Sequence, residues 1–561
     1  MSQPNPSTAQ ARALVDELHR HGVRLAVISP GSRSAALAIA FEQHPAVETR
    51  VVLDERSAAF LALGHARASE VPVVAVSTSG TAVANYLPAV VEADPSMVPL
   101  ILMTADRPPE LRHVGSNQTI DQVGVFGGRT RWFCDVGLAD ITLDLNGYWR
   151  STIAQAVARA NGHGSRPGPV HLNLSFREPT VAVSDDGRTQ SDSYAFSIEG
   201  RSDGSPWQVD GVAPPGPADL GSLEGNRGVV VAGQGDYDRD ELVAEGERLG
   251  WPILATALSG LRGDNAVDTY HHLFVDGVPP PLTPDLVVTI GHIGPSDRFS
   301  SLTGVTCPQI HLDRWGAWRD PRRQSTHVIE ADPVATLHSL DNVADSDWKA
   351  LWDSGNREMR SALDERITGE PNLSGPAIAR SIGATRAGQV VVSSSMPVRD
   401  VDAHTRTAAR VFANRGASGI DGFVSTALGI ATGRKSTLAL TGDLSFLHDA
   451  GGLVIDELPD VVFVVVDNDG GGLFDHLPQA VHSPDFERLF VAPHGLDLAR
   501  LARAHGLKGL DVDAVEDLVA EVDSGMAEGG AHVLVAKVDR ETDLKMRRGL
   551  DDTARAVVAG L

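Results

Sequence analysis

The sequence predicts an α/β protein made of three Rossmann-like parallel-sheet domains, of which the outer two are related. Short apolar runs alternate with helical patterns along most of the 561 residues, which is typical of parallel sheets covered by helices. Several runs end in Gly, Ser, Asp or Asn, where such sheets bind ligands. Landmarks of the first third recur in the same order in the last third, which indicates a duplicated layout.

The composition divides the chain into four parts. We expect a first α/β domain at 1–183, a linker rich in Gly, Pro and Ser at 184–222, a central α/β domain at 223–370 and a last α/β domain at 371–561. The expected strands are Leu25–Ile28, Val51–Leu53, Val73–Val76, Leu100–Met103, Val170–Asn173, Val229–Ala232, Ile253–Ala255, Leu286–Ile290, Ile310–Leu312, Leu438–Leu440 and Val461–Val466. The central domain has only a lone Gly233-Gln234-Gly235 without an acidic partner, so we interpret it as structural.

In the first domain, the strand at Leu25–Ile28 ends in a Ser/Gly turn that contains Arg33. Such a turn, between a strand and a helix, is a ready anion site, although it also fits a plain βα turn with a surface arginine. Glu55 follows the strand expected at Val51–Leu53. Its carboxylate is therefore expected either in an apolar pocket or in a solvated Asp54-Glu55-Arg56 cluster.

The last domain has two strands that end in possible metal ligands. One stops at Gly442-Asp443, and the other stops at Asp467-Asn468-Asp469 and opens into three glycines. Because parallel strands present their carboxyl ends at one edge, we expect Asp443 and Asn468 side by side. Their hard oxygen atoms suit Mg²⁺, which often keeps phosphate groups in its shell. The alternative is that both sequences form ordinary turns.

The first and last domains share spaced landmarks. Ala62–Ala66 (ALGHA) is echoed by Ala427–Ala431 (ALGIA). The separation from Gly80 to Asp106 equals that from Gly442 to Asn468. Several landmarks agree in order, so we favour a repeat over chance similarity.

Charge and cysteine content exclude some classes of function. A net charge of −25 argues against non-specific binding to nucleic acid or anionic membranes. The two cysteines lie far apart and in no metal or redox spacing, which fits a reducing cytosol. We see no signal peptide, and no apolar run approaches the roughly 20 residues of a membrane span. We therefore expect a cytoplasmic protein.

Several segments together resemble the 2-succinyl-5-enolpyruvyl-6-hydroxy-3-cyclohexene-1-carboxylate synthases, thiamine diphosphate enzymes of the menaquinone pathway. The segments are Ile28–Ser34 (ISPGSRS), Asp54–Arg56 (DER), Thr78–Ala82 (TSGTA), Asn117–Thr119 (NQT), Asn414–Gly422 (NRGASGIDG) and Gly442–Phe446 (GDLSF). The chain departs from the wider superfamily at Asp467, where an Asn is usual, and at Leu444, which is the variant of this family.

The resemblance implies a reaction and an assembly. The outer domains would bind the pyrimidine and the diphosphate of thiamine diphosphate. The enzyme would decarboxylate 2-oxoglutarate and add the succinyl-semialdehyde carbanion to isochorismate. Mg²⁺ or Mn²⁺ would be held by Asp443, Asn468 and Gly470. The family also implies a homodimer, or a dimer of dimers, with the cofactor between subunits.

The resemblance also assigns residues. It assigns catalytic roles to Glu55, Arg33, Gln118, Arg399 and Arg415. It assigns substrate binding to Ser32, Arg33, Arg107, Gln118, Ser395 and Arg399. It places the cofactor against Glu55, Thr81, Ile420, Gly442, Asp443, Leu444, Ser445, Asn468, Gly470, Gly471, Leu473 and Phe474. Both substrates carry carboxylates, which explains the need for arginines in an acidic chain; Arg298 is the basic candidate of the central domain.

Three alternatives stay open at this point. The chain could be another thiamine diphosphate enzyme, such as an acetohydroxyacid synthase or a 2-oxoacid decarboxylase. It could be a nucleotide-binding regulatory or scaffold protein, or an inactive paralogue. Glu55 upstream and Asp443 with Asn468 downstream favour the cofactor over the scaffold hypothesis, and Glu55 with the arginines speaks against inactivity.

Overall fold

The computed structural model describes residues 5–140, 143–181, 197–211, 213–220, 226–263, 265–294, 296, 298–341, 343–344, 346–433 and 435–561. The chain divides into two compact units, which we call unit 1 and unit 2. Unit 1 consists of Met1–Val212, Asn414–Arg434 and Leu447–Pro459. Unit 2 consists of Ala213–Ala413, Lys435–Phe446 and Asp460–Leu561.

Unit 1 is built on a six-stranded parallel sheet in the order β2-β1-β3-β4-β6-β5. Its strands are β1 (Leu25–Ile28), β2 (Glu48–Val51), β3 (Val73–Ser77), β4 (Leu100–Asp106), β5 (Trp132–Asp135) and β6 (Val170–Ser175). The inner strands β1, β3, β4 and β6 are buried along their whole length, as parallel strands covered on both faces should be.

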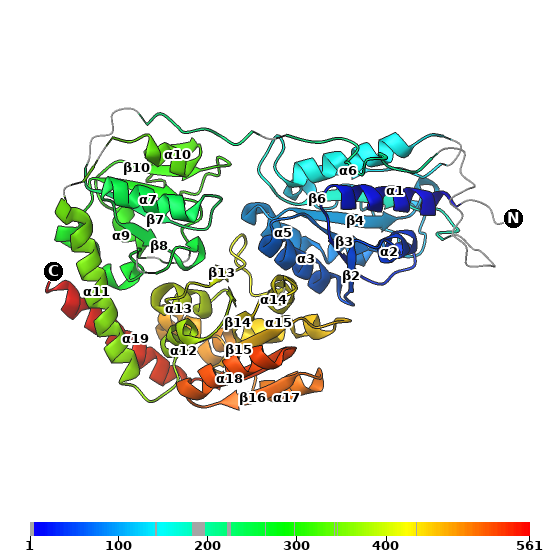
Figure 1. The fold of residues 1–561 in the computed structure, drawn as a ribbon. Coiled ribbons are helices and arrows are strands. Elements are labelled where there is room, and N and C mark those ends of the chain that lie inside the picture. The colour runs from blue at the N-terminus through cyan, green and yellow to red at the C-terminus, as the bar shows by residue number, and fades with distance from the viewer. Residues whose placement is uncertain are drawn as a thin grey trace. The chain divides into compact units, whose positions relative to one another are not determined.

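Helices cover both faces of this sheet, with α1 and α6 on one face and α3 and α5 on the other (Figure 1). The helices of unit 1 are α1 (Pro6–Arg20), α2 (Ala35–Glu42), α3 (Glu55–Ser69), α4 (Thr81–Ala84), α5 (Leu87–Ser96), α6 (Asn146–Ala160) and α14 (Phe423–Ala431), with short 3₁₀ turns η1 (Pro109–Leu111), η2 (Gly127–Arg129) and η7 (Ala450–Leu453).

The two echoed segments of the sequence meet in unit 1, because α3 packs along α14. A Cβ on Gly64 would lie 2.1 Å from the Thr426 carbonyl oxygen, and one on Gly429 would lie 2.0 Å from the Leu61 carbonyl oxygen. The glycine in each Ala-Leu-Gly segment therefore lets the two helix backbones approach closely.

Unit 2 contains two parallel sheets. The five-stranded sheet runs β11-β10-β9-β7-β8 and is made of β7 (Gly228–Ala232), β8 (Ile253–Ala255), β9 (Leu286–Ile290), β10 (Gln309–Asp313) and β11 (His327–Glu330). Its helices and 3₁₀ turns are α7 (Arg239–Leu249), η4 (Ala257–Ser259), α8 (Tyr270–Leu273), η5 (Pro280–Leu282), α9 (Phe299–Thr303), α10 (Pro333–His338) and α11 (Ser346–Thr368).

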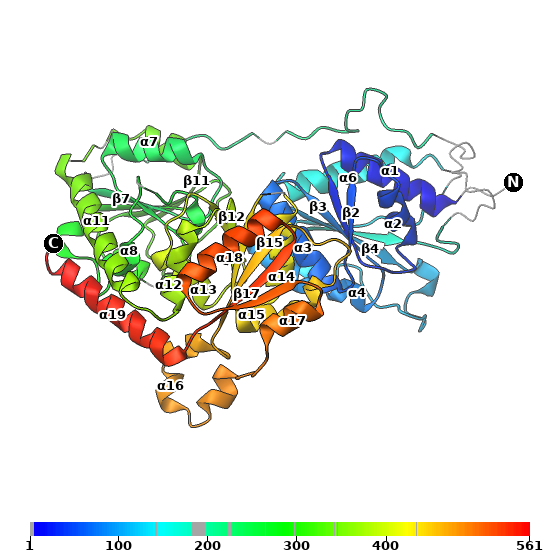
Figure 2. The same ribbon diagram turned by 60° about the horizontal axis from the view of Figure 1, so that its bottom comes forward.

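The six-stranded sheet of unit 2 runs β13-β12-β14-β15-β17-β16. Its strands are β12 (Gln389–Val392), β13 (Arg410–Phe412), β14 (Thr437–Gly442), β15 (Val461–Asp467), β16 (Lys508–Val512) and β17 (Ala531–Lys537). The helix α18 (Val515–Glu528) lies across β15 and β17 (Figure 2). The other helices and short turns are α12 (Gly375–Ser381), η6 (Ile382–Ala384), α13 (Met396–His404), α15 (Asp443–His448), η8 (Gly472–His476), α16 (Gln479–His482), η9 (Glu487–Val491), α17 (Leu498–Ala504) and α19 (Arg540–Val558).

The two six-stranded sheets have the same topology. Numbered in chain order within each sheet, the strands of both run 2-1-3-4-6-5, and all the pairings are parallel. The structure therefore confirms the predicted fold class of three parallel-sheet α/β domains with related outer domains. No helix among the described residues is long and apolar enough to cross a membrane.

One strand prediction is wrong in position. The expected strand at Val51–Leu53 is β2 at Glu48–Val51, and Glu55 is the first residue of α3 rather than the end of a strand. The physical reason is that β2 is an edge strand with half-exposed polar side chains, so apolar clustering does not mark it.

The predicted linker at 184–222 lies partly outside the described residues, which omit 182–196, 212 and 221–225. Its described parts contain turns and bends and form no helix or strand. The division into these four parts stays a prediction.

Candidate active site

Glu55 begins α3 in unit 1. The preceding Asp54 caps the helix by accepting N–H groups from Arg56 and Ser57, which fixes where the helix starts. The Glu55 side chain is half-buried, and its Oε2 accepts a hydrogen bond from Asn85 Nδ2 at 3.2 Å. Tyr86 is fully buried, and burial followed by the charge of Glu55 raises the pKa of its phenol. Neither Asn85 nor Tyr86 was predicted, because nothing in the local sequence links them to Glu55.

A basic cluster forms where β1, β3 and β4 end in unit 1. Arg107 follows β4, is 9% exposed, and its Nη1 donates to Ser79 Oγ after β3. Gln118 also contacts Ser79. Its side-chain Nε2 donates to the Ser79 carbonyl oxygen at 3.0 Å, and its backbone carbonyl oxygen accepts from Ser79 Oγ at 3.0 Å. Burial lowers the pKa of the Arg107 guanidinium, and the charge of Arg33 lowers it further. Two buried guanidinium groups that repel each other form a site that would favour a bound anion.

Arg33 is held by groups of its own unit. Its Nη1 donates to the Phe176 carbonyl oxygen at 2.9 Å, and its Nη2 lies 2.8 Å from the Glu178 carboxylate. The turn that carries it is pressed onto the end of β3, because a Cβ on Gly31 would lie 2.3 Å from Thr78 Cβ. The predicted substrate residues Arg33, Arg107 and Gln118 therefore come together.

Four other predicted residues belong to unit 1, and two of them follow these strand ends. Ser32 is exposed in the turn before α2, and Thr81 is exposed at the first position of α4. Arg415 and Ile420 lie in the segment that precedes α14. Gln122 was missed; its Oε1 lies 3.4 Å from the Gly80 N–H, which helps to shape the turn after β3.

In unit 2, Asp443 is a buried member of the predicted metal-ligand set. It is 2% exposed, and its Oδ2 accepts N–H groups from Gly470 at 2.8 Å and Asn468 at 3.3 Å, while Oδ1 accepts from Leu444 at 2.6 Å. Burial raises the pKa of the Asp443 carboxyl. The prediction that β14 and β15 bring these residues together is correct within unit 2, since β14 and β15 are paired to their ends.

A histidine that sequence reasoning missed completes this cluster. His494 Nε2 lies 3.4 Å from Asp443 Oδ2 and 3.8 Å from Asp467 Oδ1. Asp443, Asp467 and His494 each offer a ligand atom within 4.8 Å of the others. The His494 loop is held by Asp469, whose Oδ1 accepts from the His494 and Gly495 N–H groups at 2.9 and 2.8 Å. Sequence analysis missed His494 because it lies beyond the 472–491 segment, far along the chain from Asp443 and Asp467, and no local sequence pattern links it to them.

The glycine run after β15 has a steric reason. Gly470 has φ +131°, and a Cβ there would lie 2.2 Å from the Val491 carbonyl oxygen. Gly471 donates its N–H to the same oxygen at 2.7 Å. The predicted cofactor residues Leu473 and Phe474 follow in η8, where the Phe474 ring lies 5.7 Å from that of Phe490.

Ser395 and Arg399 flank the start of α13 in unit 2. Ser395 has φ +73° and precedes the helix, and Arg399 Nη1 donates back to its carbonyl oxygen at 2.7 Å. The neighbouring Ser393 Oγ lies 3.4 Å from the Gly442 N–H, so the ends of β12 and β14 adjoin. Leu444 and Ser445 follow Asp443 in the first turn of α15 and share this edge.

Arg298 does not join this edge of unit 2. Its Nη2 donates to Asp551 at 3.0 Å, and its Nη1 donates to the Val275 carbonyl oxygen. Within the segment that suggested it, 291–298, residues 295 and 297 lie outside the described part. Arg298, the basic candidate of the central domain, therefore forms an ion pair with a residue of α19.

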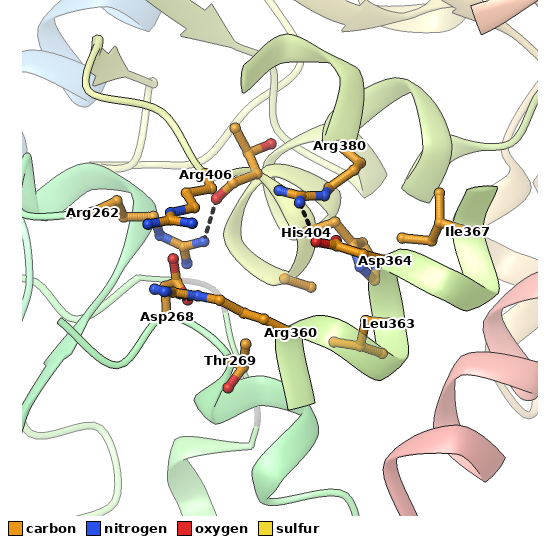
Figure 3. A pocket seen from close by; sticks show the side chains of 12 residues that line it. Arg262, Asp268, Thr269, Arg360, Leu363, Asp364, Ile367, Arg380, His404 and Arg406 are labelled. Atoms are coloured by element: carbon orange, nitrogen blue, oxygen red, sulfur yellow. Dashed lines mark hydrogen bonds and ion pairs between the residues drawn. The ribbon is translucent and has the colours of Figure 1, made fainter. Parts of the chain in front are cut away.

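A separate polar cavity lies beside α11, α12 and the end of α13 (Figure 3). Arg360 Nη2 pairs with Asp268 at 2.7 Å, Arg380 pairs with Asp364, and Arg262 Nη1 donates to the Thr405 carbonyl oxygen at 2.8 Å. Its lining contains none of the predicted site residues. Since much of its positive charge is matched by carboxylates, we assign it no role in the site.

The donor set at β14 and β15 fits the group that the family implies. A buried carboxylate, a carboxamide and a backbone carbonyl are ligands for a hard divalent cation, and glycines beside them admit a phosphate group. A cation here would also offset the burial of Asp443, whose carboxyl faces a second carboxylate, Asp467.

Comparisons with known proteins agree with this geometry. Residues 9–125 match the N-terminal TPP binding domain of thiamine pyrophosphate enzymes, and residues 393–536 match the C-terminal TPP binding domain. A 2-succinyl-5-enolpyruvyl-6-hydroxy-3-cyclohexene-1-carboxylate synthase of Thermobifida fusca is 41% identical over 99% of this chain and 100% of the relative. The chain belongs to this synthase family. Synthases of the same name from Saccharopolyspora erythraea and a Roseiflexus species are 40% and 36% identical over 90% and 98% of the chain, and over 91% and 99% of those relatives.

Membership of the synthase family confirms the family resemblance and identifies the chain as a thiamine diphosphate-binding enzyme. It also removes the nucleotide-binding scaffold from consideration. The metal, the oligomeric state and the role of each residue stay predictions.

Proposed function

We propose that this protein decarboxylates 2-oxoglutarate and joins the resulting four-carbon unit to isochorismate, which yields 2-succinyl-5-enolpyruvyl-6-hydroxy-3-cyclohexene-1-carboxylate for menaquinone synthesis. The main support for the proposal is that the chain is similar, over nearly its whole length, to relatives named as synthases of this compound. The basic cluster of unit 1 supports it, because both substrates are carboxylates.

Thiamine diphosphate, when bound, supplies the electron sink that a 2-oxo acid needs to lose CO₂. In our proposal the chain contributes a proton carrier, Glu55, whose Oε2 would hold or release a proton at the pyrimidine ring. Asn85 fixes that carboxylate by its 3.2 Å hydrogen bond, and α3 positions it at its first turn. Ile420 would supply the apolar support of the cofactor.

The edge of β14 and β15 would hold the metal and the diphosphate. Asp443 and Asn468 would offer side-chain oxygens and Gly470 its carbonyl oxygen to Mg²⁺ or Mn²⁺. Gly442, Leu444, Ser445, Gly471, Leu473 and Phe474 would surround the cofactor. Thr81 belongs to the proposed cofactor contacts of unit 1.

The arginines would bind and orient the substrates. Arg33 and Arg107, with Ser32 and Gln118, form the proposed carboxylate site of unit 1. Arg399 and Ser395 form that of unit 2, and Arg415 is the further catalytic arginine. Guanidinium groups bind carboxylates through paired N–H donors, which fixes orientation as well as charge.

We further propose that the protein works in the cytoplasm as a homodimer or a dimer of dimers. Support for the assembly comes from the family, and support for the location from the scarcity of cysteine. Sedimentation at decreasing concentration tests the assembly, and a monomer that keeps full activity at high dilution would contradict it.

The function is tested by following isochorismate absorbance with purified protein, Mg²⁺, thiamine diphosphate and 2-oxoglutarate, each left out in turn. Loss of isochorismate that needs every component is the expected result. Consumption of 2-oxoglutarate at the same rate without isochorismate would reject the proposed acceptor and favour a simple 2-oxoacid decarboxylase. Absence of any turnover with bound cofactor would reject the proposed reaction.

A further inference from the structure

A buried carboxylate of unit 1 holds the backbone of the segment that precedes α14. Glu92 lies on α5, is 2% exposed, and accepts N–H groups from three consecutive residues of that segment. The distances are 2.8 Å from Gly416 to Oε1, and 2.7 Å from Ala417 and 3.3 Å from Ser418 to Oε2. Hydrogen bonds to an ionised acceptor are about twice as strong as neutral ones, so this is a firm attachment.

Two further groups fix the Glu92 carboxylate itself. Ser96 Oγ, one turn later on α5, donates to Oε1 at 2.8 Å. Arg67 Nη2, near the end of α3, donates to the same oxygen at 3.1 Å, and both members of this ion pair are buried. Since α3 begins with Glu55, one carboxylate connects the helix of the proposed proton carrier to the 414–422 segment.

The glycines of this segment are explained by the same attachment. A Cβ on Gly416 would lie 2.3 Å from the Glu92 carbonyl oxygen and 2.6 Å from Ser96 Oγ. Gly422 has φ +65°, and a Cβ there would lie 2.1 Å from the Phe60 ring on α3. The segment is thus pressed onto α5 at one end and onto α3 at the other, and any side chain at either glycine would push it away.

Arg415 and Ile420 lie on either side of the three amides that Glu92 binds. A shift of the 416–418 backbone would displace both of them, and small displacements of oriented groups cost much of their effect. Glu92 acts on the backbone between these two residues, through the amides of residues 416–418.

We propose that Glu92 is a positioning residue of the active site, which sets the places of Arg415 and Ile420 by holding the amides of residues 416–418. This inference rests on the proposed function for the roles of those two residues. The attachment itself does not depend on the reaction, so it can be tested separately.

The test compares Glu92→Gln with the wild type in three measurements. Amide hydrogen exchange reports the attachment, because Gln keeps the size but loses the charge and presents an NH₂ group to N–H donors. We expect exchange at residues 416–418 to accelerate at least tenfold. We expect the KM of one carboxylate substrate and the Kd of thiamine diphosphate to rise about tenfold, with kcat of the saturated enzyme changed less. Ser96→Ala, which removes a single contact to Glu92, is the matched control and should change each value less than threefold.

Gly416→Ala is the second variant, in case Glu92→Gln folds poorly. It leaves Glu92 in place but forces the segment off α5, so it should reproduce the changes in exchange, KM and Kd. Glu92→Asp keeps the charge and should recover part of the loss relative to Glu92→Gln.

Two results would overturn the inference. One is unchanged exchange at residues 416–418 in both variants. The other is a lower melting temperature with unchanged KM and Kd, which would leave Glu92 a purely structural residue. If the wild type has no synthase activity but Glu92→Gln still frees these amides, the proposed function fails while the attachment stands.

Discussion

The two six-stranded sheets share one strand order but differ in the charged clusters at their carboxyl edges. At the edge of the first sheet, Arg107 donates to Ser79 and lies close enough to Arg33 for the two charges to interact, and the two arginines form the basic cluster. At the edge of the last sheet, Asp443 and Asp467 lie beside His494. Topology therefore determines where a ligand can bind, whereas the side chains at the strand ends determine which charge it has.

The fourth strand of each six-stranded sheet allows the same comparison between two residues of one type. Both β4 and β15 end in an aspartate. Asp106 is paired with Arg112 at 2.8 Å and accepts from Asn173 at 2.9 Å, so its charge is satisfied inside unit 1. Asp467 instead faces a second carboxylate, Asp443, and a histidine. An aspartate at a strand end is thus a metal candidate only where the protein supplies it no cation of its own.

We expect the largest effect on turnover, from substitution of Glu55, the acidic residue of unit 1 that we propose as a proton carrier. Glu55→Gln should lower kcat by about 10²–10⁴-fold, as is typical when a proton carrier is lost. Thiamine diphosphate affinity, measured by calorimetry, should change little. Asp54→Asn is the matched control, because Asn caps a helix as well as Asp, and it should keep near-normal kcat. Normal turnover of Glu55→Gln would remove Glu55 from the mechanism.

A matched pair of amide substitutions, at Asp443 and at Asp106, tests whether aspartates at the two sheet edges differ in function. Asp443→Asn should weaken metal-dependent binding of thiamine diphosphate by about 100-fold or more, because it removes a proposed metal ligand. Asp106→Asn should leave that affinity unchanged but lower the free energy of unfolding by about 3 kcal/mol, because it breaks a buried ion pair. Calorimetry and urea unfolding measure the two quantities. Equal effects of both variants on cofactor affinity would break the comparison.

The basic edge is tested by Arg107→Gln. Charged hydrogen bonds contribute about 1.5–3 kcal/mol, so the KM of a carboxylate substrate should rise about 10- to 100-fold. Arg177→Gln is the control, because it removes an exposed arginine paired only with Glu110. Initial rates at varied 2-oxoglutarate and isochorismate give both KM values. If neither KM rises, the cluster does not bind substrate.

The smallest expected effect comes from Asp467→Asn, which restores the amide usual in the wider superfamily. Loss of one charge a few ångströms from the metal should weaken binding of Mg²⁺ and Mn²⁺ by about 1 kcal/mol, or about fivefold. Titration of the protein with each ion in the presence of thiamine diphosphate measures this. Identical affinities before and after the change would mean that Asp467 lies outside the influence of the ion.

Much of the fold could be predicted because buried parallel strands leave a strong local signal. The strands at Leu25–Ile28, Ile253–Ala255 and Leu286–Ile290 have the predicted bounds. The buried inner strands β12 and β17 were not predicted, and the edge strands β2 and β16 have polar, half-exposed faces, so the same signal misplaces β2 and misses β16. Pairing with a neighbour, rather than local apolar content, makes them strands.

The sequence by itself determined the fold class, the duplicated order of elements, the family, and the places of Glu55, Asp443 and the Gly-rich segments in the chain. These depend on local composition, spacing and repetition, which can be read in one dimension. Only the tertiary structure decided that His494 faces Asp443, that Arg33 and Arg107 share one cluster, and that Glu92 holds the amides of 416–418. The physical reason is that each of these contacts joins segments far apart in the chain. Local periodicity does not encode such contacts. They follow from which strands pair and from how closely glycines let the backbones approach.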